Sequence, residues 1–131
     1  MWEIPTWKVD EPVVRGQYRY IKADRLTRKA EFKHVFTLGE KVVGKHFICY
    51  LAPRDEQGCA MGLAVSRKVG NAVIRNRLKR YLRECYRTHK TQFQKSGAMV
   101  IVARPASAAL SYAECVEAVQ SMWRRGGLLH A

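Results

Sequence analysis

Basic side chains that can bind phosphate groups gather in one segment of this chain. Residues 64–90 contain nine Lys and Arg and one acidic residue, Glu84, so they carry +8 of the formal net charge of +13. Four of the basic residues recur at a spacing of four, which places them on one face of a helix. They are Arg75, Lys79, Arg83 and Arg87. Like charges at this spacing destabilise an isolated helix by about 0.2–0.5 kcal/mol per pair. A bound polyanion would reverse that effect, so the pattern favours a nucleic-acid partner.

Aromatic rings and amide side chains offer a second kind of contact with a nucleic acid. Phe32 and Phe36 stand four residues apart and Tyr50 lies in a predicted strand. Exposed, these rings would stack on unpaired bases; buried, they are ordinary core, and the sequence leaves both possibilities open. Asn71 precedes the predicted basic helix, whose first amides can meet a phosphate. Asn76 can form a hydrogen bond with a base or a hydrated metal.

Side chains for catalysis by the protein itself are not grouped in the sequence. A metal-dependent nuclease needs several carboxylates close together, yet residues 58–113 contain Glu84 as their one acidic residue. Two further acidic pairs are expected in a turn and on the solvated side of the last helix. They are Asp55 with Glu56, and Glu114 with Glu117. The four histidines are scattered, and no Ser, His and Asp set can be named, so we expect no catalytic protein residue.

The composition indicates a single intracellular domain. The chain has 131 residues, of which 47% are hydrophobic, and no apolar run approaches the roughly 20 residues of a membrane span. Its N-terminus lacks the pattern of a signal peptide, so a cytoplasmic location is expected. The four cysteines form no Cys-x-x-Cys pair, which predicts buried reduced thiols rather than a zinc site. An anionic membrane or an acidic protein remains a competing partner for so basic a chain.

Hydrophobic spacing predicts a first helix and then a pair of strands. The helix is expected to run from Thr27, as N-cap, to Gly39, as C-cap. Residues 41–53 predict a short strand followed by a longer one, and residues 59–66 predict another strand. Because only the turn 55–58 separates the last two strands, we expect them to pair as an antiparallel hairpin.

The second half of the chain predicts helix, strand and helix. The basic helix is expected over residues 72–89, with Asn71 as its cap. Its buried stripe is formed by Ile74, Leu78, Leu82 and Cys85. Residues 98–104 are almost all apolar, which is typical of a central strand covered on both faces. The last helix is expected over residues 111–124, so the fold class is α+β, an α/β sandwich of one small sheet with helices.

The two ends of the chain lack this periodicity. Residues 1–22 are predicted to be an extension that is at least partly disordered, and residues 23–125 the domain. Residues 126–131 are predicted to be a frayed C-terminal tail.

The basic helix and the loop before it carry a recognisable motif. Residues 66–80 read SRKVGNAVIRNRLKR, which closely resembles the signature of the bacterial ribonuclease P protein subunit, including its Arg-Asn-Arg core. The resemblance extends to LTRKAEFKHVF with Gly39, in the first helix, to FICYLAP and MGLAVS, in the paired strands, and to MVIVARPAS, in the later strand. It spans residues 26–125.

The resemblance implies a fold and a role. The implied element order is α-β-β-β-α-β-α, a single small mixed sheet like that of the second domain of ribosomal protein S5. It also implies a left-handed crossover at the basic helix, against the usual right-handed rule. In this family the protein joins a catalytic RNA that, with Mg²⁺ bound mainly by that RNA, removes the 5′ leader of precursor tRNA. The implied partners are therefore the catalytic RNA subunit and precursor tRNA, with no membrane and no organic cofactor.

The resemblance also divides the candidate residues into two sets by position. One set matches the family's binding cleft for the leader or its edge. It comprises Phe32, Phe36, Tyr50, Ser66, Arg67, Arg75 and Asn76. The other set matches the face towards the catalytic RNA. It comprises Lys68, Asn71, Arg77, Lys79, Arg80 and Arg83.

Two other functions stay open at this point. One is a basic RNA-binding module of another ribonucleoprotein, such as a ribosome-associated protein, and the other is a self-sufficient protein nuclease. The free protein is expected to be monomeric.

Overall fold

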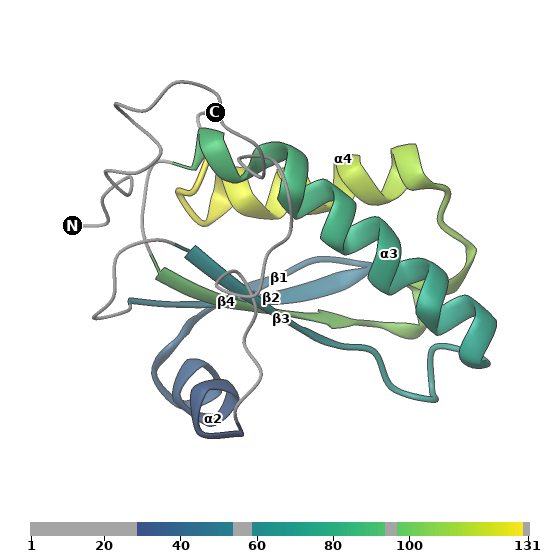
Figure 1. The fold of residues 1–131 in the computed structure, drawn as a ribbon, viewed down its shortest axis with the longest axis horizontal. Helices are drawn as coiled ribbons and strands as arrows, with labels where there is room; N and C mark the ends of the chain where they lie inside the picture. The colour runs from purple at the N-terminus through teal and green to yellow at the C-terminus, as the bar shows by residue number, and fades with distance from the viewer. Residues whose placement is uncertain (1–28, 54–58, 94–96, 130–131) are drawn as a thin grey trace.

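Residues 29–53, 59–93 and 97–129 are described by the computed structural model, and they form one sheet with helices on both of its faces (Figure 1). The strands are β1 (Glu40–Val43), β2 (Phe47–Ala52), β3 (Cys59–Ala64) and β4 (Gly97–Ala103). The helices are α2 (Lys29–Leu38), α3 (Ala72–His89) and α4 (Tyr112–Arg125), with short 3₁₀ turns η2 (Lys90–Gln92) and η3 (Pro105–Ala109). Helix α2 covers one face, and α3 and α4 cover the other (Figure 1).

The sheet has the strand order β1-β2-β4-β3, which makes the predicted β2–β3 hairpin wrong. Strand β4 lies between these two strands, antiparallel to β2 and parallel to β3. The physical reason is that β4 is the most apolar strand and is buried almost throughout, so the central position shields it best. The short connection 53–58 had favoured a hairpin, but burial of β4 decides the pairing.

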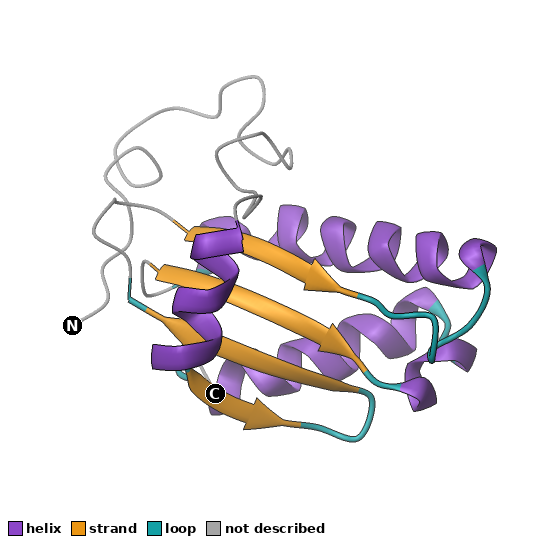
Figure 2. Ribbon diagram, turned by 90° about the horizontal axis from the view of Figure 1, so that it is seen from below, coloured by secondary structure: helices purple, strands orange, loops and turns teal. Residues whose placement is uncertain are grey.

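A helical crossover joins the two parallel strands. The chain leaves β3, returns along α3 and enters β4 beside β3 (Figure 2). Figure 2 views the sheet from the α2 side; from the opposite side, with α3 in front and β3 and β4 pointing up, β4 lies to the left of β3, so the crossover is left-handed. This confirms the fold that the family resemblance implied, against the common right-handed rule.

The larger core lies between the sheet and the pair α3 and α4. Alternate residues of β2, Phe47, Cys49 and Leu51, point into it because successive side chains of a strand face opposite sides. Trp123 of α4 is fully buried in it and stands edge-to-face with Phe93, at 4.9 Å between ring centroids. The predicted stripe of α3 is confirmed, with three of its members buried and Ile74 packed against the cluster.

All four cysteines are buried and reduced, as predicted. Loss of solvation by burial raises the pKa of Cys49, Cys85 and Cys115 to about 12 in each case. These thiols therefore pack as small apolar groups and do not ionise near neutral pH.

The predicted helix starts are confirmed where the structure describes them. Asn71 caps α3, its side-chain oxygen accepting the Ile74 N–H at 3.0 Å. Ser111 caps α4 in a capping box with Glu114, which exchanges both hydrogen bonds with it. The predicted N-cap Thr27, the turn 55–58 and the extension 1–22 lie outside the described residues.

The prediction of a frayed C-terminal tail is wrong for residues 126–129. Gly127 has a φ of 80°, which turns the chain back after α4 at a conformation that glycine adopts freely. Leu128 and Leu129 then both donate their backbone N–H groups to the Trp123 carbonyl and bury their side chains in the core. The two leucines were read as a tail because too few residues remain there to show a period.

Candidate nucleic-acid interface

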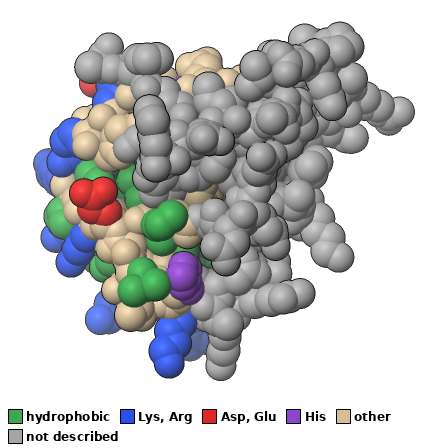
Figure 3. Space-filling view, turned by 90° about the vertical axis from the view of Figure 1, so that its left-hand side faces the viewer, with side chains coloured by type: hydrophobic (Ala, Val, Ile, Leu, Met, Phe, Trp, Pro, Cys, Tyr) green, Lys and Arg blue, Asp and Glu red, His purple; other side chains and the backbone are tan. Residues whose placement is uncertain are grey.

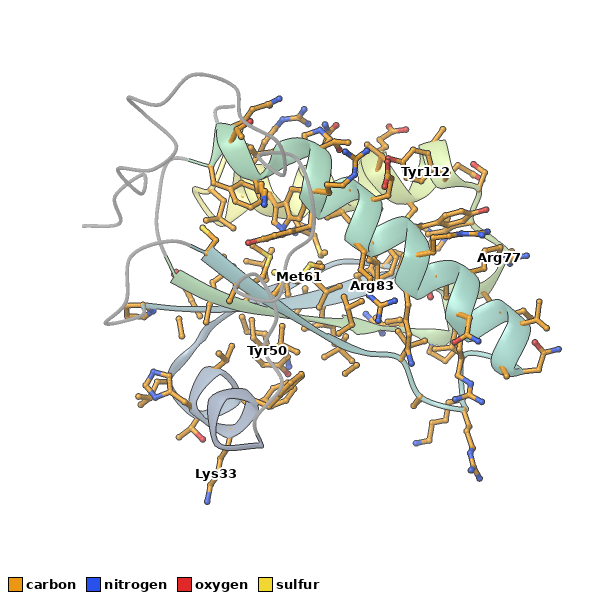
Figure 4. The ribbon with its side chains drawn as sticks, in the orientation of Figure 1. Lys33, Tyr50, Met61, Arg77, Arg83 and Tyr112 are labelled. Atoms are coloured by element: carbon orange, nitrogen blue, oxygen red, sulfur yellow. The ribbon has the colours of Figure 1, made fainter. Side chains whose placement is uncertain are left out.

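An aromatic group lies where α2 meets the sheet. The Phe36 ring stands edge-to-face on Tyr50, 4.8 Å between centroids, and 6.4 Å from the Phe32 ring. Lys41, the cross-strand partner of Tyr50, places its ammonium 5.8 Å from the centre of the Tyr50 ring. Tyr50 lies between the sheet and α2 (Figure 4). Three of the predicted site residues are thus brought together, joined by a cation that the sequence had not indicated.

These rings are partly exposed rather than buried. Phe36 keeps 41% of its surface exposed, while Phe32 and Tyr50 are half-buried and pack against a small cluster around the buried Val35 and Val100. That answers the question left open by the sequence, because the rings both fix α2 to the sheet and offer aromatic surface to a ligand.

The α2 face of the sheet, meaning the face that α2 packs on, continues beyond the aromatic group. Register places Tyr50, Val100 and Gly62 in one row and Ile48, Val102 and Ala64 in the next. The three residues of the second row remain half-buried, because α2 packs over the other end of this face. Two residues beyond Ala64 comes Ser66, so the distance along the strands from the Tyr50 row to Ser66 is about 13 Å.

The loop that follows β3 presents polar and basic groups at the end of this face. Ser66, Arg67 and Lys68 are exposed, and Val69 is buried beneath them. The loop is held to α3, since Arg75 donates from Nε to the Gly70 carbonyl at 3.2 Å. This face therefore combines aromatic and apolar side chains with a basic loop at its end. Proteins that bind single-stranded nucleic acids use the same combination, in which bases stack on the rings and basic groups bind the phosphates.

The basic residues of α3 divide between two sides of the helix. Lys79 is half-buried beside Arg75, while Asn76, Arg80 and Arg83 are exposed. Arg83 extends from α3 towards the sheet, whereas Arg77 lies on the side of α3 near Tyr112 of α4 (Figure 4).

Arg87, the last member of the predicted basic ladder, is occupied within the helix. Its guanidinium donates from Nε to Glu84 Oε2 at 3.0 Å and pairs with the other carboxylate oxygen through Nη2. Hydrogen bonding to Arg87 lowers the pKa of the Glu84 carboxyl, so this pair stays ionised at neutral pH. Of the predicted ladder, this leaves Arg75, Lys79 and Arg83 to contact a partner.

Arg77 is tied into the fold as well as being a candidate RNA contact. Its Nη2 donates to the Ala108 carbonyl of η3 at 2.8 Å, and its Nε is buried without a partner among the described residues. The contact spans 31 residues and joins α3 to the connection before α4. No sequence signal could have shown it, because it depends on how α3 packs against η3.

The surface at the end of the molecule opposite the start of α3 is also rich in basic groups. Over the described part of that side, Lys and Arg side chains lie along the left edge and the bottom, beside exposed hydrophobic side chains, and acidic side chains cover little of it (Figure 3). Within the described residues, no group of three or more His, Cys, Asp or Glu is placed to hold a metal ion. In the same part of the chain, no helix has the length and apolar character needed to cross a membrane.

The fold and this surface define a class, namely a small α+β protein with a partly exposed sheet face and a basic helix, a combination that suits an RNA partner. The family model described as Ribonuclease P matches residues 21–127. The chain belongs to the ribonuclease P protein family. It is therefore the protein subunit of a ribonucleoprotein endoribonuclease that acts in tRNA 5′ processing.

Individual relatives agree with that assignment. The ribonuclease P protein component of Exiguobacterium sibiricum is 34% identical over 108 residues, covering 82% of this chain and 93% of the relative. That of Geobacillus kaustophilus is 36% identical over 107 residues, covering 81% and 88%. An RNase P protein mutant from Staphylococcus aureus superposes with a TM-score of 0.79 at 27% identity, covering 82% of this chain and 92% of that one. The RNase P protein of Thermotoga maritima gives 0.71 at 25% identity, covering 77% and 96%.

Proposed function

We propose that this protein binds the 5′ leader of precursor tRNA along the α2 face of the sheet while its basic helix binds the RNA subunit. The observation that carries the proposal is the continuity of aromatic rings, half-buried apolar side chains and basic loop along one face. It supports a single-stranded ligand, since rings for base stacking lie at one end of the face and basic groups at the other, and a rigid duplex has no unstacked bases to offer.

The leader set contributes two interactions. Phe36 and Tyr50, with Phe32 behind them, provide ring faces that stack on unpaired bases of any sequence. Ser66, Arg67 and Arg75, at the loop end, neutralise and hydrogen-bond the leader phosphates, and Asn76 offers an amide beside them. Lys41 adds a charge at the aromatic end, through the same contact that orients Tyr50.

The RNA-subunit set acts mainly through charge. Lys68, Lys79, Arg80 and Arg83 stand on the loop and α3 and release counterions when they meet RNA phosphates. Asn71 and Arg77 already serve the fold, as helix cap and as tie to Ala108, so their role is to hold the loop and α3 in place for the others.

Catalysis is then assigned to the RNA. The described carboxylates are not clustered, so the Mg²⁺ that hydrolysis of the leader phosphodiester requires would be held mainly by the RNA subunit. The protein contributes substrate binding and neutralises phosphate repulsion between the two RNAs. We propose further that it works in the cytoplasm and that the free protein is a monomer.

Affinity measured with matched substrates tests this function. The holoenzyme and the RNA subunit alone are each titrated with precursor tRNA and with the mature tRNA that lacks a leader. The proposal expects the protein to strengthen binding of the precursor much more than binding of the mature product. Equal strengthening of both would contradict leader binding by the protein, while leaving RNA binding intact.

A further inference from the structure

A small cavity lies between the β1–β2 turn and α4, away from the leader and RNA-subunit sets. Its volume is about 130 Å³. Its walls come from the turn and from one side of the helix. They are formed by Gly44, Lys45, His46 and Phe47, and by Ala118, Ser121, Met122 and Arg125.

Two arginines fix the turn that forms this cavity. Arg125 donates from Nη1 to the Val43 carbonyl at 3.0 Å, and Arg104 donates from Nη1 to the Gly44 carbonyl at 2.9 Å. Each of these bonds uses one of the five N–H donors of a guanidinium. Both side chains are exposed, so their remaining donors can reach a ligand in or beside the cavity.

The other polar groups at the cavity suit an anion. Lys45 and Ser121 are exposed and His46 is half-buried, so an ammonium, a hydroxyl and an imidazole line the cavity together with the guanidinium of Arg125. Glu114 lies on the same side of α4, but its carboxylate accepts the Ser111 N–H at 3.0 Å in the capping box. The acid is thereby engaged at the helix start, one turn beyond the cavity wall.

Size decides which anion fits. Sites for cofactor-sized molecules have volumes of roughly 300–1,000 Å³, well above that of this cavity. A single phosphate group fits, with the rest of its molecule outside. We propose that the cavity holds one backbone phosphate of the RNA subunit, held by Arg125, Lys45 and Ser121, with Arg104 beside it. This rests on the proposed function, in which that RNA is the protein's partner.

The position of the cavity determines which parts of the protein the RNA subunit would contact. It lies at the β1–β2 edge of the sheet, whereas the basic loop 66–71 follows β3 at the opposite edge. Three strand spacings separate these edges, which amounts to about 14 Å. The RNA subunit would therefore grip the protein at both edges of the sheet and leave the α2 face between them open for the leader.

Variants that each remove one positive charge test the site, and the same change at a neighbouring residue outside the cavity serves as the control. Lys45→Gln and Arg125→Gln each remove one cation from the cavity, and Arg124→Gln removes one from the exposed residue beside Arg125 that does not line it. Binding to the RNA subunit is measured by fluorescence anisotropy over a series of KCl concentrations. We expect each cavity variant to lose about tenfold in affinity and to lower the salt slope by about 1, while Arg124→Gln changes neither.

Two outcomes would overturn the site. If Lys45→Gln matches Arg124→Gln while the wild-type protein binds the RNA subunit, the cavity holds no phosphate of that RNA, and the proposed function stands. If the wild-type protein does not bind the RNA subunit, the proposed function fails and the site with it. Arg125→Gln also removes the hydrogen bond to the Val43 carbonyl, and thermal unfolding followed by circular dichroism shows whether this variant is destabilised. In that case Lys45→Gln, which breaks none of the described bonds, decides.

Discussion

Replacing Phe36 by Ala removes the most exposed ring of the aromatic group. Stacking of one base on a protein ring contributes about 1–3 kcal/mol, so the variant should bind precursor tRNA about 5- to 150-fold more weakly in the holoenzyme. Binding of mature tRNA should not change, because that product has no leader to stack.

Phe36→Ala should lower the free energy of unfolding much less than the replacement of a fully buried ring by Ala would. A fully buried Phe costs roughly 3–5 kcal/mol when replaced by Ala, but Phe36 keeps 41% of its surface exposed. Loss of its edge-to-face contact with Tyr50 and of partial burial should cost about 1–2 kcal/mol. That leaves a typical domain folded, so the binding defect can be measured on native protein.

Leu38→Ala provides the matched control. Leu38 lies on the same helix with 65% of its surface exposed, and it belongs to no aromatic contact among the described residues. Fluorescence titration of precursor and mature tRNA with both variant holoenzymes gives the comparison. Stacking of the leader on Phe36 is refuted if Phe36→Ala weakens the binding of both tRNAs equally, or if Leu38→Ala shows the same selective loss.

Two further variants and two properties of the buried thiols give separate predictions. Arg77→Ala should lower the free energy of unfolding in urea by about 1–3 kcal/mol, because it removes the donor to Ala108, whereas the exposed Arg80→Ala should stay within about 0.5 kcal/mol. Equal free energies of unfolding for the two variants would show that the hydrogen bond from Arg77 to Ala108 does not stabilise the fold. Arg80→Ala should instead reduce the salt slope of RNA binding by about 1, and an unchanged slope would exclude a phosphate contact. The four thiols should react with a disulfide reagent at pH 8 only after unfolding, and reaction of any one at a free-thiol rate in the native protein would contradict its burial. Since burial raises the pKa of Cys49 from 9.0 to about 12, its contribution to stability is complete below pH 9 and is lost as the pH rises towards 12.

The helices and their caps could be predicted because their signals are local. Asn71 and Ser111 stand directly before periodic apolar residues, and a side chain of that type bonds to an amide only three positions away. The central place of β4 could be predicted for a similar reason, since its own apolar run shows that both of its faces are covered.

The strand pairing could not be predicted in the same way. A short connection between β2 and β3 favours a hairpin, and only the three-dimensional competition for the buried position puts β4 between them. The left-handed crossover came from family resemblance alone, because the general rule points the other way.

The candidate site was predictable by residue type but not by contact. The aromatic residues and the basic helix were evident, yet the ion pair of Arg87 with Glu84 and the bond of Arg77 to Ala108 change what each arginine can do. Lys41 was missed because its approach to Tyr50 depends on the β1–β2 register, which no spacing within one strand reveals.

Cleavage of precursor tRNA at low Mg²⁺ tests the central claim most directly. Purified protein, RNA subunit and the two together are incubated with end-labelled precursor, and release of the 5′ leader is followed. We expect no cleavage by the protein alone, slow cleavage by the RNA, and much faster cleavage by the complex. Leader release by the protein without RNA would contradict a catalytic role for the RNA, and no stimulation by the protein would contradict its role as the subunit that binds both RNAs.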